Sequence, residues 1–93
     1  MQKNKIVFLI RAYNEATRIT GVIESIIAAW YDQILVVDDG SIDGTNDILS
    51  HLAKKNLIHL VHHATNRGAG AALETGFAYI RATHLQNHWK YLV

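Results

Sequence analysis

Two segments in the first half of the chain are almost continuously apolar. They are Lys5–Ile10 and Ile34–Val37. Short apolar runs without polar alternation are typical of strands that are buried on both faces, as in a parallel sheet covered by helices. Asn56–His62 and Trp89–Val93 predict a third strand and the beginning of a fourth.

Between these segments the apolar residues recur every three or four positions, which is the period of a helix buried along one side. The sequence predicts helices from about Ala16 to Trp30, after the turn Asp43–Thr45, and from Ala69 to about Leu85. The expected inward residues are Ile19, Val22, Ile23, Ile26, Ile27 and Trp30 in the first helix, Ile48, Leu49 and Leu52 in the second, and Leu73, Gly76, Phe77, Ile80 and His84 in the third.

Polar residues stand where these helices are expected to begin. Glu15 or Thr17 lies near the start of the first helix, and Asp43 or Thr45 can cap the second. Gly76 lies in the middle of the third helix, where glycine costs up to about 1 kcal/mol relative to alanine. We therefore expect a close contact between that helix and the sheet.

The elements alternate in the order β-α-β-α-β-α-β. This order predicts an α/β fold with a parallel sheet, right-handed crossovers and helices on both faces, a Rossmann-like three-layer α/β/α arrangement. With 93 residues, no proline and no linker-like segment, residues 1–93 are expected to form a single domain.

Composition excludes several classes of function. The net charge is +1 and the nine Lys and Arg residues are scattered, so we expect no nucleic-acid partner. No apolar run approaches the roughly 18 residues of a membrane span, and the run after the basic N-terminus is too short for a signal peptide. The chain has no cysteine, which excludes disulfides and thiolate metal sites and fits a cytoplasmic location.

Polar residues gather in the three loops that follow the expected strands. These loops are Arg11–Glu15, Asp38–Gly44 and His63–Gly70. The carboxyl ends of parallel strands meet at one edge of the sheet, where open α/β folds bind ligands. The sequence therefore predicts a pocket for a polar ligand at this edge.

The adjacent acids Asp38 and Asp39 carry most of this prediction. Aspartate before Gly-Ser also makes turns, and for one such residue that interpretation would be preferred. Two neighbouring carboxylates are costly without a use, which favours a functional role. Because strand side chains alternate, only one of the two can face a given ligand, and the other is free to bond the turn.

Other residues at this edge are more ambiguous. Asn66–Gly70 lacks both the GxGxxG and the P-loop patterns, so it is either a helix entry that needs small residues or a close approach to free N–H groups. His62 and His63 are neighbours on a strand and point apart, which makes them a poor metal chelate. Tyr13 and Trp30 could each be core residues, but Tyr13 follows a strand end and is the better candidate for stacking.

Three passages together resemble the family-2 glycosyltransferases, which use nucleotide-sugar donors and have the GT-A fold. The passages are Ile6-Val-Phe-Leu-Ile-Arg-Ala-Tyr-Asn-Glu15, Ile34-Leu-Val-Val-Asp-Asp-Gly-Ser-Ile-Asp-Gly-Thr45 and Asn66-Arg-Gly-Ala-Gly-Ala-Ala-Leu-Glu-Thr-Gly76. The resemblance is strongest to the branch that makes polyprenyl-phosphate and dolichyl-phosphate sugars. It implies that residues 1–93 form the N-terminal, nucleotide-binding half of a GT-A domain.

The resemblance also implies roles for the residues at the edge. Tyr13 would stack on or border the nucleotide base, and Glu15 would lie by the ribose or base. Asp39 would hydrogen-bond the base or ribose with support from Asp38, and Val37 would offer a backbone contact.

Two arginines complete the implied site. Arg67 and Gly68 belong to the loop that borders the donor. Arg11 stands where the family often has proline, which puts a backbone contact at that position in doubt, although an arginine there could contact a phosphate.

The resemblance implies a divalent cation as well. In the family, the strand matching Tyr91–Val93 runs into an Asp-x-Asp motif that holds Mg²⁺ or Mn²⁺ on a UDP- or GDP-sugar, and this sequence stops before it. We expect the metal ligands beyond Val93 and no catalysis by these residues alone. The alternative is a non-catalytic remnant that binds nucleotide or associates with another chain, including a second copy through an open sheet edge.

Two other classes are set aside. A phospho-receiver domain has an acidic pair after its first strand, but it needs a later acceptor aspartate at a strand end, and the only later ones are Asp43 and Asp47. A dinucleotide-dependent dehydrogenase would need a glycine-rich loop after the first strand, where this chain has Arg11–Glu15.

Overall fold

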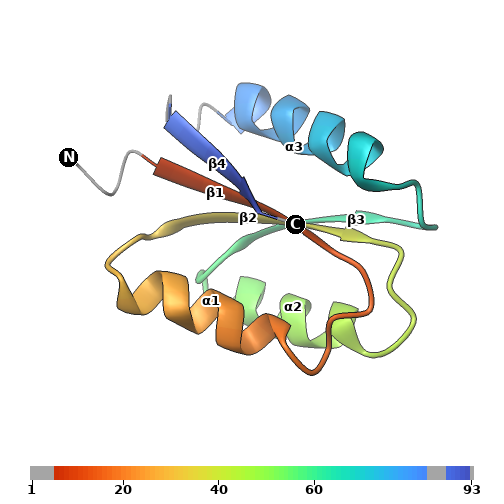
Figure 1. Ribbon diagram of the computed structural model, residues 1–93, viewed down its shortest axis with the longest axis horizontal. Helices are drawn as coiled ribbons and strands as arrows, with labels where there is room; N and C mark the ends of the chain where they lie inside the picture. Colours follow the sequence, from red (N-terminus) through yellow and green to blue (C-terminus); the bar gives the residue numbers. More distant parts are fainter. Residues whose placement is uncertain (1–5, 84–87, 93) are drawn as a thin grey trace.

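The computed structural model describes residues 6–83 and 88–92, the last five as backbone only (Figure 1). Strands and helices alternate as predicted: β1 (Ile6–Ala12), α1 (Ile19–Ala28), β2 (Gln33–Asp39), α2 (Thr45–Lys54), β3 (His59–His63), α3 (Ala69–Thr83) and β4 (His88–Leu92). None of the helices within these residues is long and apolar enough to cross a membrane.

The strands form one parallel sheet in the order β3-β2-β1-β4. Helices α1 and α2 cover one face of this sheet and α3 covers the other, so the predicted three-layer α/β/α arrangement is confirmed (Figure 1). After β3 the chain crosses back over the sheet through α3 and adds β4 beside β1. The strand order therefore reverses at β1, and in open α/β sheets the ligand site lies at the carboxyl ends of the strands next to such a reversal.

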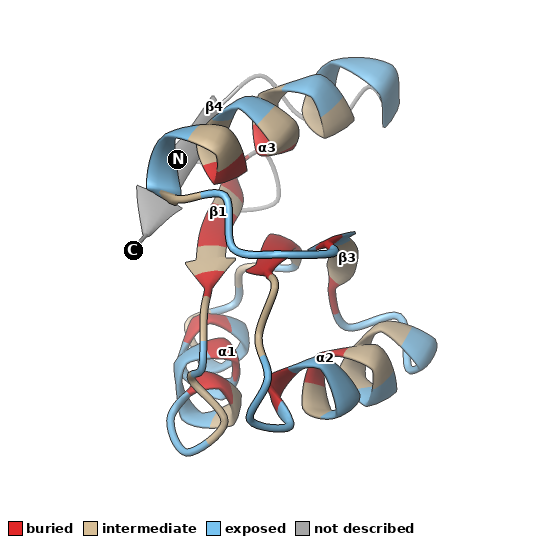
Figure 2. Cartoon of the chain, turned by 90° about the vertical axis from the view of Figure 1, so that its right-hand side faces the viewer, coloured by how far each residue is buried: buried red, intermediate tan, exposed pale blue. Residues whose placement is uncertain are grey.

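Two apolar clusters hold the layers together, one on each side of the sheet. Figure 2 shows the buried positions on the strands and on the helix sides that face them. The cluster under α1 and α2 consists of Ile10, Ala12, Ile19, Ile23, Ile26, Ile34, Val36, Leu49 and Ile58. The cluster under α3 consists of Val7, Leu9, Leu35, Val37 and Ala72.

The expected close contact at Gly76 is confirmed. A Cβ atom at this position would lie 2.5 Å from Leu9 Cδ1, so only glycine lets α3 approach β1 this closely. Leu73 and Ile80 pack beside it as predicted. Ala72 is a buried contact that the predicted stripe did not include, and His84, Leu85 and Val93 lie outside the described residues.

Helix α1 is shorter than predicted at both ends. Residues 16–18 form a turn instead of the first helical turn, because the amides of Glu15 and Ala16 bond to side chains at the start of α2 and in the loop before it. The prediction that Trp30 faces inward is wrong. Its backbone has a φ of 72°, which ends the helix, and the residue is 83% exposed. Val22 and Ile27 are exposed too, which leaves a narrower buried stripe.

The strand ends also differ from the prediction, and this matters for the site. Strand β1 continues to Ala12 and β2 to Asp39, so Arg11 and both acids lie on strands and not in loops. Strand β3 begins at His59 and not at Asn56: Asn56 has a φ of 60°, and the Leu57 N–H bonds the Leu52 carbonyl at the end of α2.

Candidate functional site

Three side chains from three neighbouring strands meet at the carboxyl edge of the sheet. Arg11 comes from the end of β1, Asp39 from the end of β2 and His63 from the end of β3. Asp39 and His63 are register partners across the β2–β3 pair. By strand alternation all three face the α3 side, together with Leu9 and Val37.

Asp39 is the centre of this group. Its side chain is 0% exposed, and protein donors surround both carboxylate oxygens. Oδ1 accepts bonds from His63 Nδ1 and the Arg67 backbone N–H, each at 2.8 Å. Oδ2 accepts bonds from Arg11 Nε and the Gly68 backbone N–H, each at 2.9 Å, and lies 2.9 Å from Arg11 Nη2. A carboxylate offers about four lone-pair positions, and here all of them are used.

These donors decide the charge of Asp39. Burial alone would raise the pKa of its carboxyl group. The hydrogen bonds from His63, the Arg67 amide, Arg11 and the Gly68 amide act in the other direction and lower the pKa to about 2. Asp39 is therefore a fixed negative charge that ties β1 and β3 and the β3–α3 loop to the end of β2.

His63 connects Asp39 to α3. Its Nε2 lies 2.8 Å from Thr75 Oγ1. An ionised carboxylate can only accept, so Nδ1 carries the proton toward Asp39, and in the neutral ring Nε2 accepts from the Thr75 hydroxyl. His63 was not among the residues predicted for the site, although it begins the third of the predicted strand-end loops. The available signal was that Asp-Asp and His-His each end one of two adjacent parallel strands.

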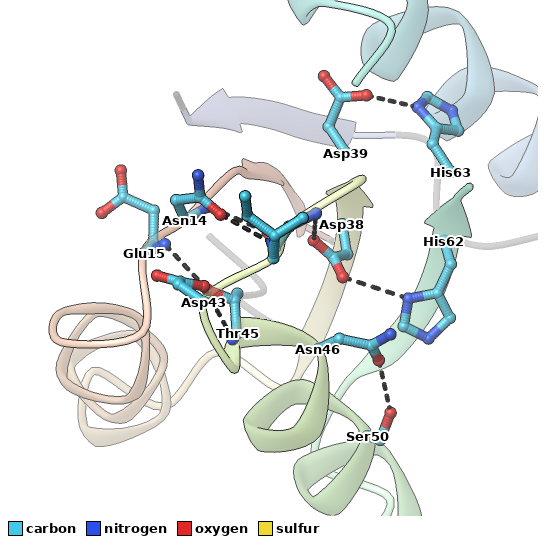
Figure 3. Close-up of polar contacts among 12 residues, drawn as sticks. Asn14, Glu15, Asp38, Asp39, Asp43, Thr45, Asn46, Ser50, His62 and His63 are labelled. Atoms are coloured by element: carbon cyan, nitrogen blue, oxygen red, sulfur yellow. Dashed lines mark hydrogen bonds and ion pairs between the residues drawn. The ribbon is translucent and has the colours of Figure 1, made fainter. Parts of the chain in front are cut away.

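The second acid–histidine pair lies on the opposite face (Figure 3). Asp38 Oδ2 is 3.4 Å from His62 Nδ1, and Asp38 Oδ1 accepts from the Ser41 backbone N–H at 3.3 Å. These bonds are long, so they hold Asp38 less firmly than the bonds to Asp39. The predictions that His62 and His63 point apart, and that one acid bonds the turn, are both confirmed.

The loops after β1 and β2 are joined by hydrogen bonds (Figure 3). Asn14 N–H donates to Ser41 Oγ at 3.0 Å, and Glu15 N–H donates to Thr45 Oγ1 at 2.9 Å. Ile42 N–H donates back to Asn14 Oδ1 at 2.9 Å. This network fixes the loop that carries Tyr13 relative to the strand that carries Asp39.

Asp43 completes this network from the β2–α2 loop. Its Oδ1 accepts from both the hydroxyl and the backbone N–H of Thr45, the first residue of α2, and its Oδ2 accepts from the Ala16 N–H. The bond from the Thr45 hydroxyl is the main cause of a lowered pKa of Asp43. Of the two predicted caps, Asp43 therefore satisfies the first helical amide, whereas Thr45 belongs to the helix.

The loops after β2 and β3 touch at Gly40. Its φ is 77°, and a Cβ atom there would lie 2.4 Å from the Thr65 carbonyl carbon. Only a residue without a side chain allows these two backbones to approach so closely. The contact helps to place the Arg67 and Gly68 amides over Asp39, and a φ of 93° at Gly68 turns the chain into α3.

The remaining predicted residues are placed as follows. Tyr13 is half-buried, with its ring centroid 5.6 Å from Arg11 Cζ, and the Arg67 side chain is exposed. Glu15 forms an ion pair with Arg18 at 2.7 Å. The side chain of Val37 is fully buried in the cluster under α3, which leaves only its backbone for a ligand.

The predicted residues therefore separate into two groups. The ones that meet at the edge on the α3 side are Arg11, Tyr13, Asp39, Arg67 and Gly68. Asp38 lies on the other face, and Glu15 is directed to the start of α1.

The described residues do not fit a divalent cation. Among residues 6–83, whose side chains the structure describes, no group of three or more His, Asp or Glu residues could hold one. The best-placed carboxylate, Asp39, has its lone pairs occupied by protein donors. We therefore assign no metal ligand to this part of the chain.

Comparison with known proteins yields one family and several relatives. The pattern of the family described as glycosyl transferase family 2 matches residues 7–86. An uncharacterized protein of Methanocaldococcus jannaschii is 38% identical over 76 residues, which cover 82% of this chain and 30% of that protein. A dolichyl-phosphate beta-glucosyltransferase of Trichomonas vaginalis is 34% identical over 87 residues, which cover 80% of this chain and 25% of the enzyme.

A poly-beta-1,6-N-acetyl-D-glucosamine synthase of Staphylococcus aureus is 32% identical over 73 residues, which cover 76% of this chain and 18% of that enzyme. The chain thus spans less than a third of the length of these curated relatives. The matched part includes all three strand-end loops of the site.

Proposed function

Because the chain belongs to glycosyl transferase family 2, we propose that its carboxyl edge binds the nucleotide of a nucleotide-diphospho-sugar donor. The observation that carries this proposal is the meeting of an aromatic ring, a buried carboxylate and a basic glycine-containing loop at one edge. Tyr13, Asp39 and Arg67–Gly68 supply these features from three separate strand-end segments.

Each feature suits a different part of a nucleotide. An aromatic ring such as Tyr13 offers a stacking surface for a base. Asp39 is an acceptor, which suits the ring N–H of uracil or guanine and excludes bases that present only acceptors there. The exposed Arg67 side chain and the positive end of the α3 dipole suit the negative charge of the diphosphate. These matches favour a UDP- or GDP-sugar as the donor.

Glu15, Asp38 and Val37 have supporting roles in this proposal. Glu15 reaches the ribose when its exposed pair with Arg18 opens, since such pairs contribute little stability. Asp38 holds the Ser41 amide and so the turn beside the site. Val37 contributes its backbone.

The reaction of the whole protein is glycosyl transfer from this donor, and we propose a polyprenyl phosphate as the acceptor. The Trichomonas vaginalis relative, a dolichyl-phosphate beta-glucosyltransferase, supports this acceptor class. We place the Mg²⁺ or Mn²⁺ of that reaction on residues outside this sequence, which contains no Asp-x-Asp motif. Such an ion would neutralise the diphosphate leaving group.

Calorimetric titration of the chain with UDP and GDP tests the proposal. We expect at least one of the two to bind. CDP and ADP should bind with at least about tenfold lower affinity, because cytosine and adenine lack the ring N–H. Tyr13→Ala is expected to weaken binding. Trp30→Ala removes an exposed aromatic residue beyond the end of α1 and is the matched control, expected to bind like the wild type.

Two results would contradict the proposal. One is the absence of binding by a chain that circular dichroism shows to be folded. The other is equal affinity for all four nucleoside diphosphates, which would indicate attraction of the phosphates alone.

A further inference from the structure

The guanidinium of Arg11 lies between Asp39 and Tyr13. Its Nε and Nη2 are each 2.9 Å from Asp39 Oδ2, and its Cζ is 5.6 Å from the centroid of the Tyr13 ring. The group is planar, presents N–H donors along one edge and lies within cation–π range of an aromatic ring. These are the two contacts that the proposed function assigns to the nucleobase.

Asp39 has no free lone pair to offer a ligand, so a base can bond to it only by replacing one of its donors. The Arg67 and Gly68 donors are backbone amides held by the β3–α3 loop. His63 is 4% exposed at its side chain and is fixed at its other nitrogen by Thr75.

Arg11 differs from the other three donors. It is a long side chain that is 20% exposed, and both of its bonds to Asp39 go to the same oxygen. Its departure would leave Oδ1 fully bonded and Oδ2 with one backbone donor. Arg11 is therefore the donor that an incoming ligand can exchange at the lowest cost.

We propose that Arg11 is an internal surrogate for the nucleobase, which occupies the base position in the free chain and must be displaced by the donor nucleotide. This inference rests on the proposed function and adds a residue that sets the affinity of the site for the base. In the free chain Arg11 keeps Asp39 Oδ2 paired and lies beside the Tyr13 ring.

The exchange imposes a chemical requirement on the ligand. The base must bring its own N–H to Asp39 Oδ2, as uracil does with N3–H and guanine with N1–H. Cytosine and adenine have an acceptor nitrogen at the equivalent position, so their ring nitrogen would face Oδ2 as a second acceptor and only the exocyclic amino group could donate. The cost of displacing Arg11 is the same for every base, so it lowers the affinity of the site for all of them, and a base with a ring N–H recovers most of that cost through its bond to Asp39.

Neutral nucleosides isolate this effect, because they lack the phosphates that an arginine would attract. We expect Arg11→Ala to bind uridine or guanosine at least about tenfold more tightly than the wild type, since no charge-assisted bond has to be broken. Arg11→Gln keeps most of the side chain and one neutral donor group. We expect its affinity for these nucleosides to lie between that of the wild type and that of Arg11→Ala. Arg81→Ala removes an exposed arginine from the last turn of α3 and should bind like the wild type.

A second measurement follows Arg11 itself in the wild-type chain. Its side-chain Nε–H is a single, assignable proton in ¹H–¹⁵N spectra, and the bond to Asp39 shifts its resonance. Saturation with UDP or GDP is expected to move this resonance or to broaden it by faster exchange with water.

The outcomes separate the inference from the function on which it depends. If the wild type and both Arg11 variants bind no nucleotide or nucleoside, both are overturned. If the wild type binds UDP or GDP but Arg11→Ala binds uridine and guanosine no more tightly than the wild type does, the inference alone is overturned. The same holds if the Arg11 Nε–H resonance stays unchanged at saturation while the Arg67 and Gly68 amides shift.

Discussion

Replacing Asp39 by asparagine tests how far this one carboxylate holds the sheet edge together. Asp39→Asn keeps the shape of the side chain but removes its charge and places an NH₂ group against N–H donors. Four donor groups from β1, β3 and the β3–α3 loop lose some or all of their partner. Removing one member of a buried ion pair costs about 3–5 kcal/mol.

The structure places the expected cost at the lower end of that range. Arg11 is 20% exposed and can turn toward water, and the remaining asparagine oxygen still accepts bonds from one pair of donors. We therefore expect a loss of about 3 kcal/mol. A chain of 93 residues has a total stability of about 5–14 kcal/mol. The variant should fold but unfold at a urea concentration lower by about 2 M, for an m-value near 1.5 kcal/mol/M.

Asp38→Asn is the matched control, because it changes the neighbouring residue of the same strand in the same way. Asp38 accepts two long bonds, of 3.3 and 3.4 Å, so we expect a loss of about 1 kcal/mol or less. Urea unfolding followed by circular dichroism near neutral pH measures both variants. Equal losses in the two variants, or a loss below about 1 kcal/mol for Asp39→Asn, would refute the reasoning.

Three further predictions concern the same edge and the packing beneath it. The pKa of Asp39 is held at about 2, below its ordinary 3.8, so its stabilisation of about 2 kcal/mol is complete above pH 3.8 and is lost as the pH falls toward 2. Urea unfolding at several acidic pH values should show this loss in the wild type and not in Asp39→Asn. Gly40→Ala should cost at least about 3 kcal/mol, because its Cβ would overlap the Thr65 backbone at a φ of 77°. Gly44→Ala, at a φ of 96° with open space around it, should cost only about 1 kcal/mol, and similar losses in both would contradict the close approach. Gly76→Ala should cost about 1–2 kcal/mol despite the better helix propensity of alanine, because the new Cβ meets Leu9; a more stable variant in thermal unfolding would contradict this.

The order of the elements followed from the sequence because apolar periodicity is a local property. Each continuous run became a buried strand, and Gly76 marked the close contact between α3 and β1. The beginning of α1 was misplaced because tertiary contacts decide it. Side chains of Asp43 and Thr45 bond the amides before α1, and no local pattern around Ala16 shows this.

The site residues were also predictable in part. The three strand-end loops and the opposite orientation of the two acids follow from a parallel sheet and strand alternation. The pair formed by Arg11 and Asp39 did not follow, because the sequence predicts both residues in loops. Only the longer strands, with Arg11 in β1 and Asp39 in β2, place the two side chains on the same face of the sheet.

The sequence also did not show that protein donors occupy all the lone pairs of Asp39. From the sequence alone, a carboxylate at a strand end is predicted to be a free acceptor for a ligand. The folded chain supplies His63 from the register partner on β3 and two amides from a loop held against Gly40. The number of free lone pairs on Asp39 depends on the tertiary structure. Because none is free, a ligand can bond to Asp39 only by replacing one of its protein donors.

We propose that the carboxyl edge of the sheet on the α3 side binds a nucleotide whose base has a ring N–H. Titration of the ¹⁵N-labelled wild-type chain with UDP and GDP, followed by ¹H–¹⁵N spectra, tests it most directly. We expect saturable shifts at the amides of Arg11, Tyr13, Arg67 and Gly68. We expect none at Trp30 and Leu57, which follow the C-terminal ends of α1 and α2. Shifts that are absent, or that are concentrated at Trp30 and Leu57, would contradict it.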